Sequence, residues 1–298
     1  MEQLKLVIQT PEPVRLCEYL RRRIGVSARL LARLKRTPAG ILCNGVPVRA
    51  VDPVRAGDVV VLTMPEQEGL EPNPALYVPS VLETAYYIVY DKPTGMPVHP
   101  SARHRRDTLG NYFAASMPGH TFRAVNRLDR DTSGLCMIAK DAYTASALQG
   151  KLEKRYYAVL CGHLTGDGTI SAPIARTEAS IITRCVRQDG KPAVTHYRVL
   201  GHSADYTAVE IRLETGRTHQ IRVHFASIGH PLAGDDLYGG SRARIGRQAL
   251  HCARQTFRVP RCETLEDGIC IEAPVDEMTL RTVTVESPLP ADMAQFFR

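Results

Sequence analysis

Most of the chain after residue 84 consists of short apolar runs of strand length, separated by turn residues and interrupted by few helical patches. Strands joined without regular helical crossovers pair mainly antiparallel, because a parallel pair needs a connection of about a dozen residues or more. The sequence therefore predicts an α+β fold with a largely antiparallel, mixed β-sheet and flanking helices and loops. The predicted strands cover residues 85–90, 135–139, 156–162, 194–200 and 206–213.

A segment rich in Glu and Pro, at residues 66–80, lacks a sustained apolar period and is typical of a linker between domains. A chain of 298 residues is long enough for one large domain and one small domain. We therefore expect a small domain at residues 1–65 and a large domain at residues 81–298.

The first 65 residues combine two helical patterns with a hairpin signal. Apolar residues recur at helical spacing between residues 14 and 36, and Ser27 can cap the second of two short helices. An Asn-Gly pair divides two apolar stretches at residues 41–48, which favours a β-hairpin, and residues 54–62 favour a final strand. This part is therefore predicted to be a small α+β domain.

Positive charge is concentrated on the two predicted helices. The chain has a net charge of +7 and a pI near 9.0, which favours an anionic partner without identifying it. An ordinary solvated helix face is one interpretation, but such faces usually mix both signs, and so we expect contact with RNA. The basic residues between the apolar positions are Arg15, Arg21, Arg22, Arg23, Arg29, Arg33, Lys35 and Arg36.

The expected compartment follows from what the sequence lacks. No apolar run reaches the roughly 20 residues that span a bilayer, and so we expect no membrane association. The N-terminus has no basic stretch followed by an apolar core, and so no secretory signal is expected. The 8 cysteines form no Cys-x-x-Cys pair, and free thiols suit a reducing compartment. We therefore expect a cytoplasmic protein.

The first candidate for chemistry is the polar turn R-L-D-R-D-T-S-G at residues 127–134, ahead of an apolar strand. Such turns commonly present catalytic groups. Asp129 and Asp131 could instead bond only their own backbone, and spacing alone leaves this alternative open. A metal pair is disfavoured, because no cluster of His, Asp or Glu stands nearby to complete a coordination shell.

The second candidate is E-K-R-Y-Y-A-V-L-C-G at residues 153–162, a basic cluster that runs into a strand. Alternation places Tyr156, Ala158 and Leu160 on one face. Ordinary β-propensity would also explain these aromatic residues. Because the chain has no Trp, any stacking on nucleic-acid bases must come from Tyr, Phe, His or Arg.

The third candidate is T-G-R-T-H-Q-I-R-V-H-F-A-S-I-G-H-P at residues 215–231. Its apolar spacing favours a helix that Thr218 can cap and Gly229 can end, although partial alternation leaves a strand open. On the helix, Arg222 lies at the margin of the buried stripe, where a guanidinium costs desolvation energy unless a carboxylate pairs with it. A purely structural ion pair is the alternative to a functional role.

Taken in order, the three segments resemble the motifs of the RluA-type pseudouridine synthases, the third continuing through L-A-G-D. The resemblance runs from residue 86 to the C-terminus and includes D-K-P-T-G-M-P-V-H-P at residues 91–100 and H-C-A at residues 251–253. The chain departs from the family at Asn126, where His is usual, and so we expect different local hydrogen bonding there. The first 65 residues resemble the small RNA-binding domain of the ribosomal protein S-four type.

The resemblance implies an enzyme that isomerises uridine in RNA to pseudouridine without a cofactor or a metal. The bond between ribose C1′ and uracil N1 breaks, the base turns, and C1′ joins uracil C5, so that nothing is oxidised and no group is imported. The uridine must first leave its stack, which costs a few kcal/mol. The resemblance makes Asp129 the catalytic carboxylate, and leaves open whether it attacks the sugar, attacks the base or removes a ribose proton.

The same resemblance assigns roles to residues around Asp129. Arg222 is implied to pair with the carboxylate and orient it. Tyr156 is implied to stack on the flipped uracil, and proton removal from C5 is a further role open to it. Arg127 is implied to fill the gap that the flipped base leaves. Arg217 and His219 are candidates for phosphate contact or for local structure.

Two other classes of protein compete with this interpretation. A glycosidase-like hydrolase would need a second carboxylate placed as acid or base, and the nearest one, Asp131, lies two residues from Asp129. A non-catalytic RNA-binding protein would suit the basic helices but needs no paired Asp and Arg.

The resemblance also indicates the substrate. The expected substrate is large-subunit ribosomal RNA, with transfer RNA as the alternative. The expected state is a monomer.

Overall fold

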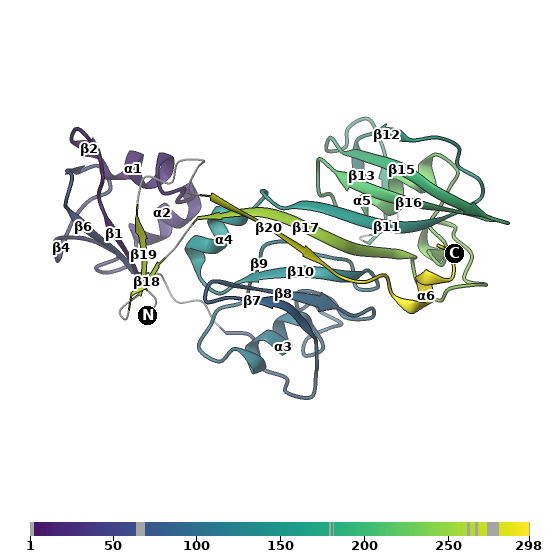
Figure 1. Cartoon of the computed structure of the whole chain (residues 1–298), viewed down its shortest axis with the longest axis horizontal. Coiled ribbons are helices and arrows are strands. Elements are labelled where there is room, and N and C mark those ends of the chain that lie inside the picture. Colours follow the sequence, from purple (N-terminus) through teal and green to yellow (C-terminus); the bar gives the residue numbers. More distant parts are fainter. Residues whose placement is uncertain are drawn as a thin grey trace.

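The computed structural model describes residues 3–63, 69–178, 180, 182–260, 263–265, 268–272 and 280–297. Two β-sheets with separate hydrophobic cores follow one another along the long axis of the molecule (Figure 1). The N-terminal sheet has six strands and the large sheet has ten. The predicted α+β class with a mixed, largely antiparallel sheet is confirmed.

The large sheet has the strand order β12-β15-β16-β11-β17-β10-β8-β7, with β20 paired to β17 and β9 paired to β10. Within this sheet only β10 and β17 pair in parallel. The five predicted strands correspond to β8, β10, β11, β15 and β16, whereas β17 and β20 were not predicted. The bounds are β7 Ser80–Glu83, β8 Tyr87–Lys92, β9 Arg123–Ala124, β10 Ser133–Ala139, β11 Glu153–Cys161, β12 Gly168–Ser171, β15 Val194–Ser203, β16 Tyr206–Leu213, β17 Leu250–Pro260 and β20 Leu280–Glu286.

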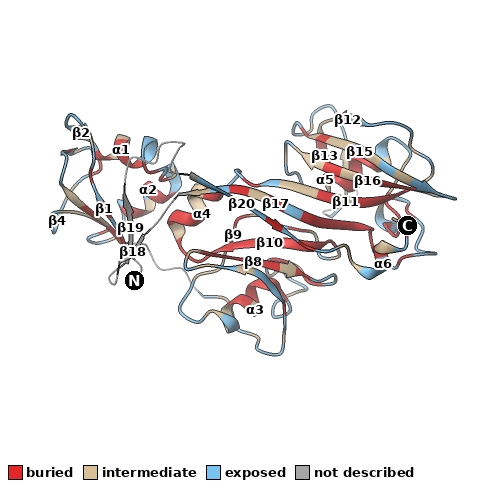
Figure 2. Ribbon diagram, viewed as in Figure 1, coloured by how far each residue is buried: buried red, intermediate tan, exposed pale blue. Residues whose placement is uncertain are grey.

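Strand β10 lies inside the large sheet, and every one of its residues is buried (Figure 2). Its sequence S-G-L-C-M-I-A is apolar at successive positions, as expected of a strand covered on both faces. Gly134 has a φ of 105°, and a Cβ at this position would lie 2.3 Å from the carbonyl oxygen of Cys252. Only glycine permits that approach, and so β10 can start against β17 directly after the polar turn.

Helix α5 (Gln220–Ser227) settles the ambiguity of the third segment in favour of the helix. As predicted, Gly229, whose φ is 83°, follows directly after the end of the helix and its C-cap Ile228. The predicted cap at Thr218 is wrong, because His219 occupies the N-cap position and makes no capping bond. The side chain of Gln220 instead accepts a hydrogen bond from the backbone N of Arg217 at 3.0 Å, which holds the chain entering the helix.

Short helices and one further hairpin complete the large part of the chain. The carboxylate of Asp141 caps α4 by accepting from the backbone N of Thr144 at 2.7 Å. Helix α4 also joins the two cores, because Tyr143 is buried among N-terminal residues and the hydroxyl of Ser146 accepts from the backbone N of Ser27. The bounds are α3 Leu109–Ser116, α4 Ala142–Leu148, β13 Ile174–Arg176, β14 Arg184–Val186, η1 Asp236–Tyr238 and α6 Ala291–Ala294.

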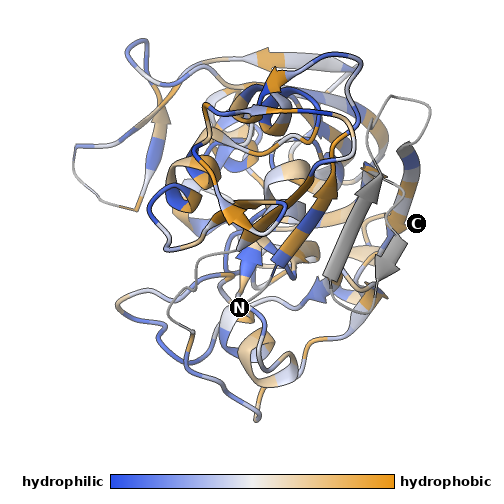
Figure 3. Cartoon of the chain, turned by 90° about the vertical axis from the view of Figure 1, so that its left-hand side faces the viewer, coloured by the Kyte–Doolittle hydropathy of each residue, from blue (hydrophilic) through white to orange (hydrophobic). Residues whose placement is uncertain are grey.

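The N-terminal sheet has the order β18-β19-β1-β6-β3-β4 and shares its core with α1 and α2. Both predicted helices are present, and the Ser27 hydroxyl accepts from the backbone N of Leu30 as predicted. The predicted hairpin is present too, since Asn44 and Gly45 have φ values of 52° and 81°, which suit a type I′ turn. Seen from this end, hydrophilic residues gather in the loops (Figure 3). The bounds are β1 Gln3–Val7, β2 Val14–Arg15, α1 Leu16–Arg22, α2 Ala28–Leu34, β3 Ile41–Cys43, β4 Val46–Pro47, β5 Pro53–Val54 and β6 Val59–Thr63.

Two strands of the N-terminal sheet come from the far end of the chain. Strand β19 (Gly268–Glu272) pairs in parallel with β1, and β18 (Glu263–Leu265) pairs with β19. Residues 66–68 of the expected linker lie outside the described residues. From residue 69 the segment lies against the large core, where Val78 is buried and the Asn111 side chain donates to the carbonyl of Glu71. The domain boundaries drawn from the sequence stay a prediction.

Candidate active site

The candidate site is built around the polar turn between β9 and β10. The backbone N of Thr132 donates to the carbonyl of Asp129 at 3.1 Å, which closes the turn. Its conformation is also fixed from outside, because the fully buried ammonium of Lys92 donates to the carbonyl of Arg130 at 3.0 Å. Lys92 also donates to two carbonyls of the β8–α3 connection. Burial lowers the pKa of Lys92 to about 8.

Asn126, where the family usually has His, ties the start of this turn to β10. Its side-chain nitrogen donates to the carbonyl of Leu135 at 3.2 Å, and its side-chain oxygen accepts from the backbone N of Met137 at 2.8 Å. Both ends of the amide are therefore used on backbone groups. The departure at this position leaves the turn anchored to the strand that follows it.

Arg222 projects from α5 toward two carboxylates. Its Nη1 lies 3.3 Å from Asp129 Oδ2, while its Nε and Nη2 donate to the two oxygens of Asp235, each at 2.7 Å. Burial opposes the charge of the guanidinium, but hydrogen bonds and charge from Asp235, together with the charge of Asp129, raise the pKa of Arg222. The predicted contact between Asp129 and Arg222 is thus present, and a second acid compensates the buried charge.

His219 contacts the same carboxylate from the start of α5. Its Nε2 lies 3.8 Å from Asp129 Oδ2, and its Nδ1 lies 2.8 Å from the hydroxyl of Tyr238. Burial lowers the pKa of His219, although the nearby charge of Asp129 acts in the opposite direction. The imidazole is therefore neutral near pH 7 and places no second cation beside Asp129.

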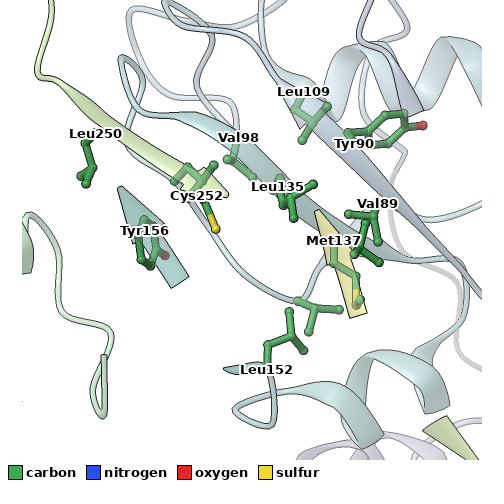
Figure 4. Close-up of a cluster of buried hydrophobic side chains, with 14 of the residues drawn as sticks. Val89, Tyr90, Val98, Leu109, Leu135, Met137, Leu152, Tyr156, Leu250 and Cys252 are labelled. Atoms are coloured by element: carbon green, nitrogen blue, oxygen red, sulfur yellow. The ribbon is translucent and has the colours of Figure 1, made fainter. Parts of the chain in front are cut away.

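Tyr156 lies in β11 on the other side of the site. Its side chain is buried beside Cys252 of β17 (Figure 4). Burial raises the pKa of Tyr156 well above its ordinary value, with further contributions from Cys252 and Asp129. The predicted face is confirmed, since Ala158 and Leu160 are buried with it. Tyr156 is thus a neutral, apolar surface with its hydroxyl kept from ionising.

Two cavities open beside Asp129. The larger, of about 640 Å³, is also lined by Arg127, His219 and Arg222, and is large enough to admit a nucleotide. A smaller one of about 60 Å³ lies where Asp129, Tyr156 and Arg222 meet, and it too is lined by Arg127 and His219. The structure therefore brings together the predicted carboxylate, arginine and tyrosine around one space.

The two remaining candidates lie at the mouth of the site. Arg127 is exposed and lines both cavities. Arg217 is exposed and donates from its Nε to the carbonyl of Pro192 at 3.0 Å. It lines the small cavity and also a neighbouring groove along β13 and β14. Both positions suit contact with a polymeric substrate outside the buried centre.

Residues that the sequence analysis did not single out complete the site. Asp235 is the last residue of the L-A-G-D stretch. The sequence signal that could have identified it is an acidic residue close in sequence to Arg222, an arginine that needs a carboxylate. Tyr238 packs its ring 5.0 Å from the Arg222 guanidinium carbon. Lys92 belongs to the D-K-P stretch and is the last residue of the buried strand β8, where its ammonium needs internal acceptors.

Within the described parts of the chain, no group of three or more His, Cys, Asp or Glu side chains is placed to hold a metal ion. None of the described helices is both long enough and apolar enough to cross a membrane. What the site does offer is the Asp129 carboxylate with an anchored oxygen, a neutral aromatic surface and cations at the entrance.

Comparison with known proteins places this geometry in a family. A family model described as RNA pseudouridylate synthase matches residues 86–227. The Bacillus subtilis protein named "Uncharacterized RNA pseudouridine synthase YjbO" is 36% identical over 287 residues, covering 92% of this chain and 95% of the relative. The ribosomal large subunit pseudouridine synthase D of Pseudomonas aeruginosa is 38% identical over 262 residues, covering 84% of this chain and 80% of the relative.

A solved structure agrees with these relatives. Human RNA Pseudouridylate Synthase Domain Containing 1 is 28% identical, with a TM-score of 0.53, and the match covers 74% of this chain and 94% of that chain. The fold and the sequence together define an enzyme that rearranges uridine within RNA. The chain belongs to the RNA pseudouridine synthases, of the RluA type, and is an isomerase. The hydrolase and the non-catalytic RNA-binding protein are thereby set aside.

Proposed function

We propose that this enzyme converts a flipped-out uridine in large-subunit ribosomal RNA to pseudouridine, with Asp129 as the catalytic carboxylate. The observation that supports the catalytic role of Asp129 is that its two carboxylate oxygens have different contacts. Oδ2 faces Arg222 and His219, whereas no hydrogen bond from the described residues reaches Oδ1. One oxygen is therefore anchored and the other is left to meet the ribose or the uracil in the cavity.

Arg222 acts by orienting this carboxylate. Its guanidinium is fixed by two bonds to Asp235, so that it presents Nη1 to Asp129 without needing to reorganise during the reaction. The reaction needs an ionised Asp129, whether it attacks carbon or removes a ribose proton. A cation held in place by a different acid stays beside Asp129 throughout the catalytic cycle.

Tyr156 supplies the surface on which the detached uracil turns. An aromatic ring beneath the base favours stacking at any rotation about the ring normal, because stacking does not depend on hydrogen-bond register. The raised pKa of Tyr156 keeps its hydroxyl protonated, which favours the stacking role over proton removal from C5. Arg127, at the mouth of both cavities, is placed to fill the gap that the flipped base leaves.

The RNA backbone would be held by two basic surfaces. One is a groove of about 500 Å³ along β13 and β14 that reaches the small cavity through Arg217. Its other basic residues are Arg176, Arg184, Arg187 and Lys191. The second is the exposed basic face of α1 and α2, in the part that resembles the ribosomal protein S-four type. Phosphates on both surfaces would orient the strand whose uridine enters the cavity.

Large-subunit ribosomal RNA is the proposed substrate because relatives at 38–40% identity carry the name ribosomal large subunit pseudouridine synthase D. Transfer RNA is the alternative that the experiment below distinguishes. A monomer in the cytoplasm remains our prediction for the state and location of the protein.

The test is to map pseudouridine in ribosomal and transfer RNA from cells that lack the protein, after incubation with purified enzyme. Wild type is expected to modify defined uridines of the large-subunit RNA. Asp129→Asn keeps the size of the side chain and is expected to lower the rate by at least about a thousandfold, as removal of a catalytic nucleophile does elsewhere. Equal rates for both proteins would remove Asp129 from the mechanism, and modification confined to transfer RNA would overturn the proposed substrate.

The contact between RNA and the N-terminal part of the chain is tested by removing positive charges. Deleting residues 1–65 would disturb more than RNA binding, because β19 pairs with β1. The variant Arg29→Gln, Lys35→Gln, Arg36→Gln changes exposed residues only. Each lost phosphate contact is expected to flatten the slope of log affinity against log salt by roughly 0.7 to 0.9. Binding titrations at several salt concentrations measure it, and an unchanged slope would assign RNA contact to the groove alone.

A further inference from the structure

His219 and Tyr238 form a hydrogen-bonded pair on the side of Asp129 that faces α5. His219 has a left-handed backbone with a φ of 58°, which is uncommon for a residue other than glycine. Such a conformation persists only where the surroundings impose it, and it turns the imidazole between Tyr238 and Asp129. The side chain is thus held where each ring nitrogen faces a different group.

The hydrogen bonds of Tyr238 determine which nitrogen of His219 carries the proton. The Tyr238 oxygen accepts from the backbone N of Arg184 at 3.0 Å. The phenol has one proton to donate, and within the described structure the acceptor placed for it is Nδ1 of His219 at 2.8 Å. Burial raises the pKa of Tyr238, so the phenol keeps that proton. A neutral imidazole whose Nδ1 accepts must carry its own proton on Nε2.

We infer that Tyr238 is a positioning residue that fixes His219 as the Nε2–H tautomer and so presents a neutral N–H donor to the Asp129 carboxylate. This inference rests on the proposed catalytic role of Asp129. The distance of 3.8 Å between Nε2 and Oδ2 exceeds hydrogen-bond length. Catalytic hydrogen bonds often tighten when substrate binds, and Asp129 Oδ2 is the carboxylate oxygen that lies near this nitrogen.

The neutral state of the donor matters for the chemistry. Asp129 already faces the cation of Arg222, and a second cation on the same oxygen would make the carboxylate a weaker nucleophile and a weaker base. A neutral N–H fixes the rotamer of Asp129 while leaving its reactivity intact. The opposite tautomer would direct a lone pair at a carboxylate and would repel it.

The first test distinguishes the role of the Tyr238 hydroxyl from the role of its ring. Tyr238→Phe keeps the ring that packs on Arg222 and removes only the hydroxyl. We expect kcat to fall about tenfold, the cost of one misplaced hydrogen bond, while KM stays within about twofold. The double variant with His219→Gln is the decisive comparison, because a Gln amide offers an N–H near the position of Nε2 without tautomers. In that background Tyr238→Phe is expected to have no further effect on kcat.

His219→Asn is the matched control, because Asn tolerates a left-handed backbone but is too short to reach Asp129. It should remain folded and lose about as much kcat as Tyr238→Phe, whereas His219→Gln should retain more. An equal fall in kcat on adding Tyr238→Phe to wild type and to His219→Gln would overturn the inference. Tyr238 would then act through Arg222 and not through the histidine.

The second test observes the tautomer without catalysis. Ring nitrogen shifts of ¹⁵N-histidine-labelled enzyme, with the His219 signals assigned by their loss in His219→Gln, should show the proton on Nε2 in wild type. Tyr238→Phe should shift the signals toward a mixture of tautomers. A wild-type spectrum with the proton on Nδ1 would overturn the inference directly. This readout is independent of whether Asp129 is catalytic, so failure of the proposed function would be seen separately in Asp129→Asn.

Discussion

The polar turn that carries Asp129 and the turn that carries Asp235 present two carboxylates to one guanidinium, and they do so under opposite conditions. Asp235 is 1% exposed and makes two bonds of 2.7 Å to Arg222. Asp129 is 19% exposed and makes one contact of 3.3 Å from a wall of the large cavity. The buried acid has no route to a substrate, whereas the more exposed one has an oxygen to spare.

This difference shows how a single arginine can serve both structure and chemistry. A buried guanidinium paired only with the catalytic acid would lose its partner whenever that acid reacted or changed its protonation state. Because Asp235 compensates the charge of Arg222 permanently, Asp129 is not needed to stabilise the buried guanidinium. The comparison therefore predicts that substitutions of the two acids will separate activity from stability.

The largest expected effect is on activity, from Asp129→Asn. The loss of at least about a thousandfold in rate should come with a change in the free energy of unfolding of no more than about 1 kcal/mol, since Arg222 keeps Asp235. Denaturant unfolding of the same preparations that are assayed measures both quantities. Asp205→Asn is the control, because this exposed acid in the turn between β15 and β16 lines neither cavity and should leave the rate nearly unchanged. A large loss of stability in Asp129→Asn alone would show that the two carboxylates share the structural role.

The next effect is on stability, from Asp235→Asn. Removing one partner of a buried ion pair leaves the other charge uncompensated, and so we expect the free energy of unfolding to fall by about 3–5 kcal/mol. Activity should fall as well, because Arg222 is no longer held toward Asp129. Asp236→Asn is the control, since its pair with Arg242 is exposed. If Asp235→Asn were as stable as wild type, Asp129 alone would compensate the charge of Arg222. The assignment of the structural role to Asp235 and of the catalytic role to Asp129 would then be wrong.

The sequence predicted the α+β class and the strands with clear apolar alternation, but it did not predict how segments distant in sequence meet. Strand β19 joins the N-terminal sheet through a parallel pairing with β1, for which no local pattern exists. The contact between Asp129 and Arg222 was predicted only by resemblance to a family, because spacing alone left Asp129 with a structural alternative. Asp235 was missed, because burial of both partners, and not their separation in sequence, makes its pairing with Arg222 necessary.

The smallest expected effect concerns Lys92 at the end of β8, whose ammonium donates to the carbonyl of Arg130 in the Asp129 turn. Lys92→Met keeps the length of the side chain but leaves three carbonyls without their donor, and we expect a loss of about 1–3 kcal/mol at pH 7. Burial places the pKa of Lys92 at about 8, below its ordinary value of about 10.4. Between these two values the unfolded chain holds a proton that the folded protein has released, and so the stability of wild type rises with pH relative to the variant.

The difference in unfolding free energy between wild type and Lys92→Met should therefore be constant below about pH 7 and widen as the pH rises from about 8 to about 10. Urea titrations at a series of pH values measure this difference. Lys35→Met, at an exposed lysine, should show no such widening. A difference that stays constant or narrows over this range would mean that Lys92 keeps its charge in the folded protein. The Asp129 turn would then be braced by a permanent cation, as Asp235 is by Arg222, and the two regions would be more alike than their exposure indicates.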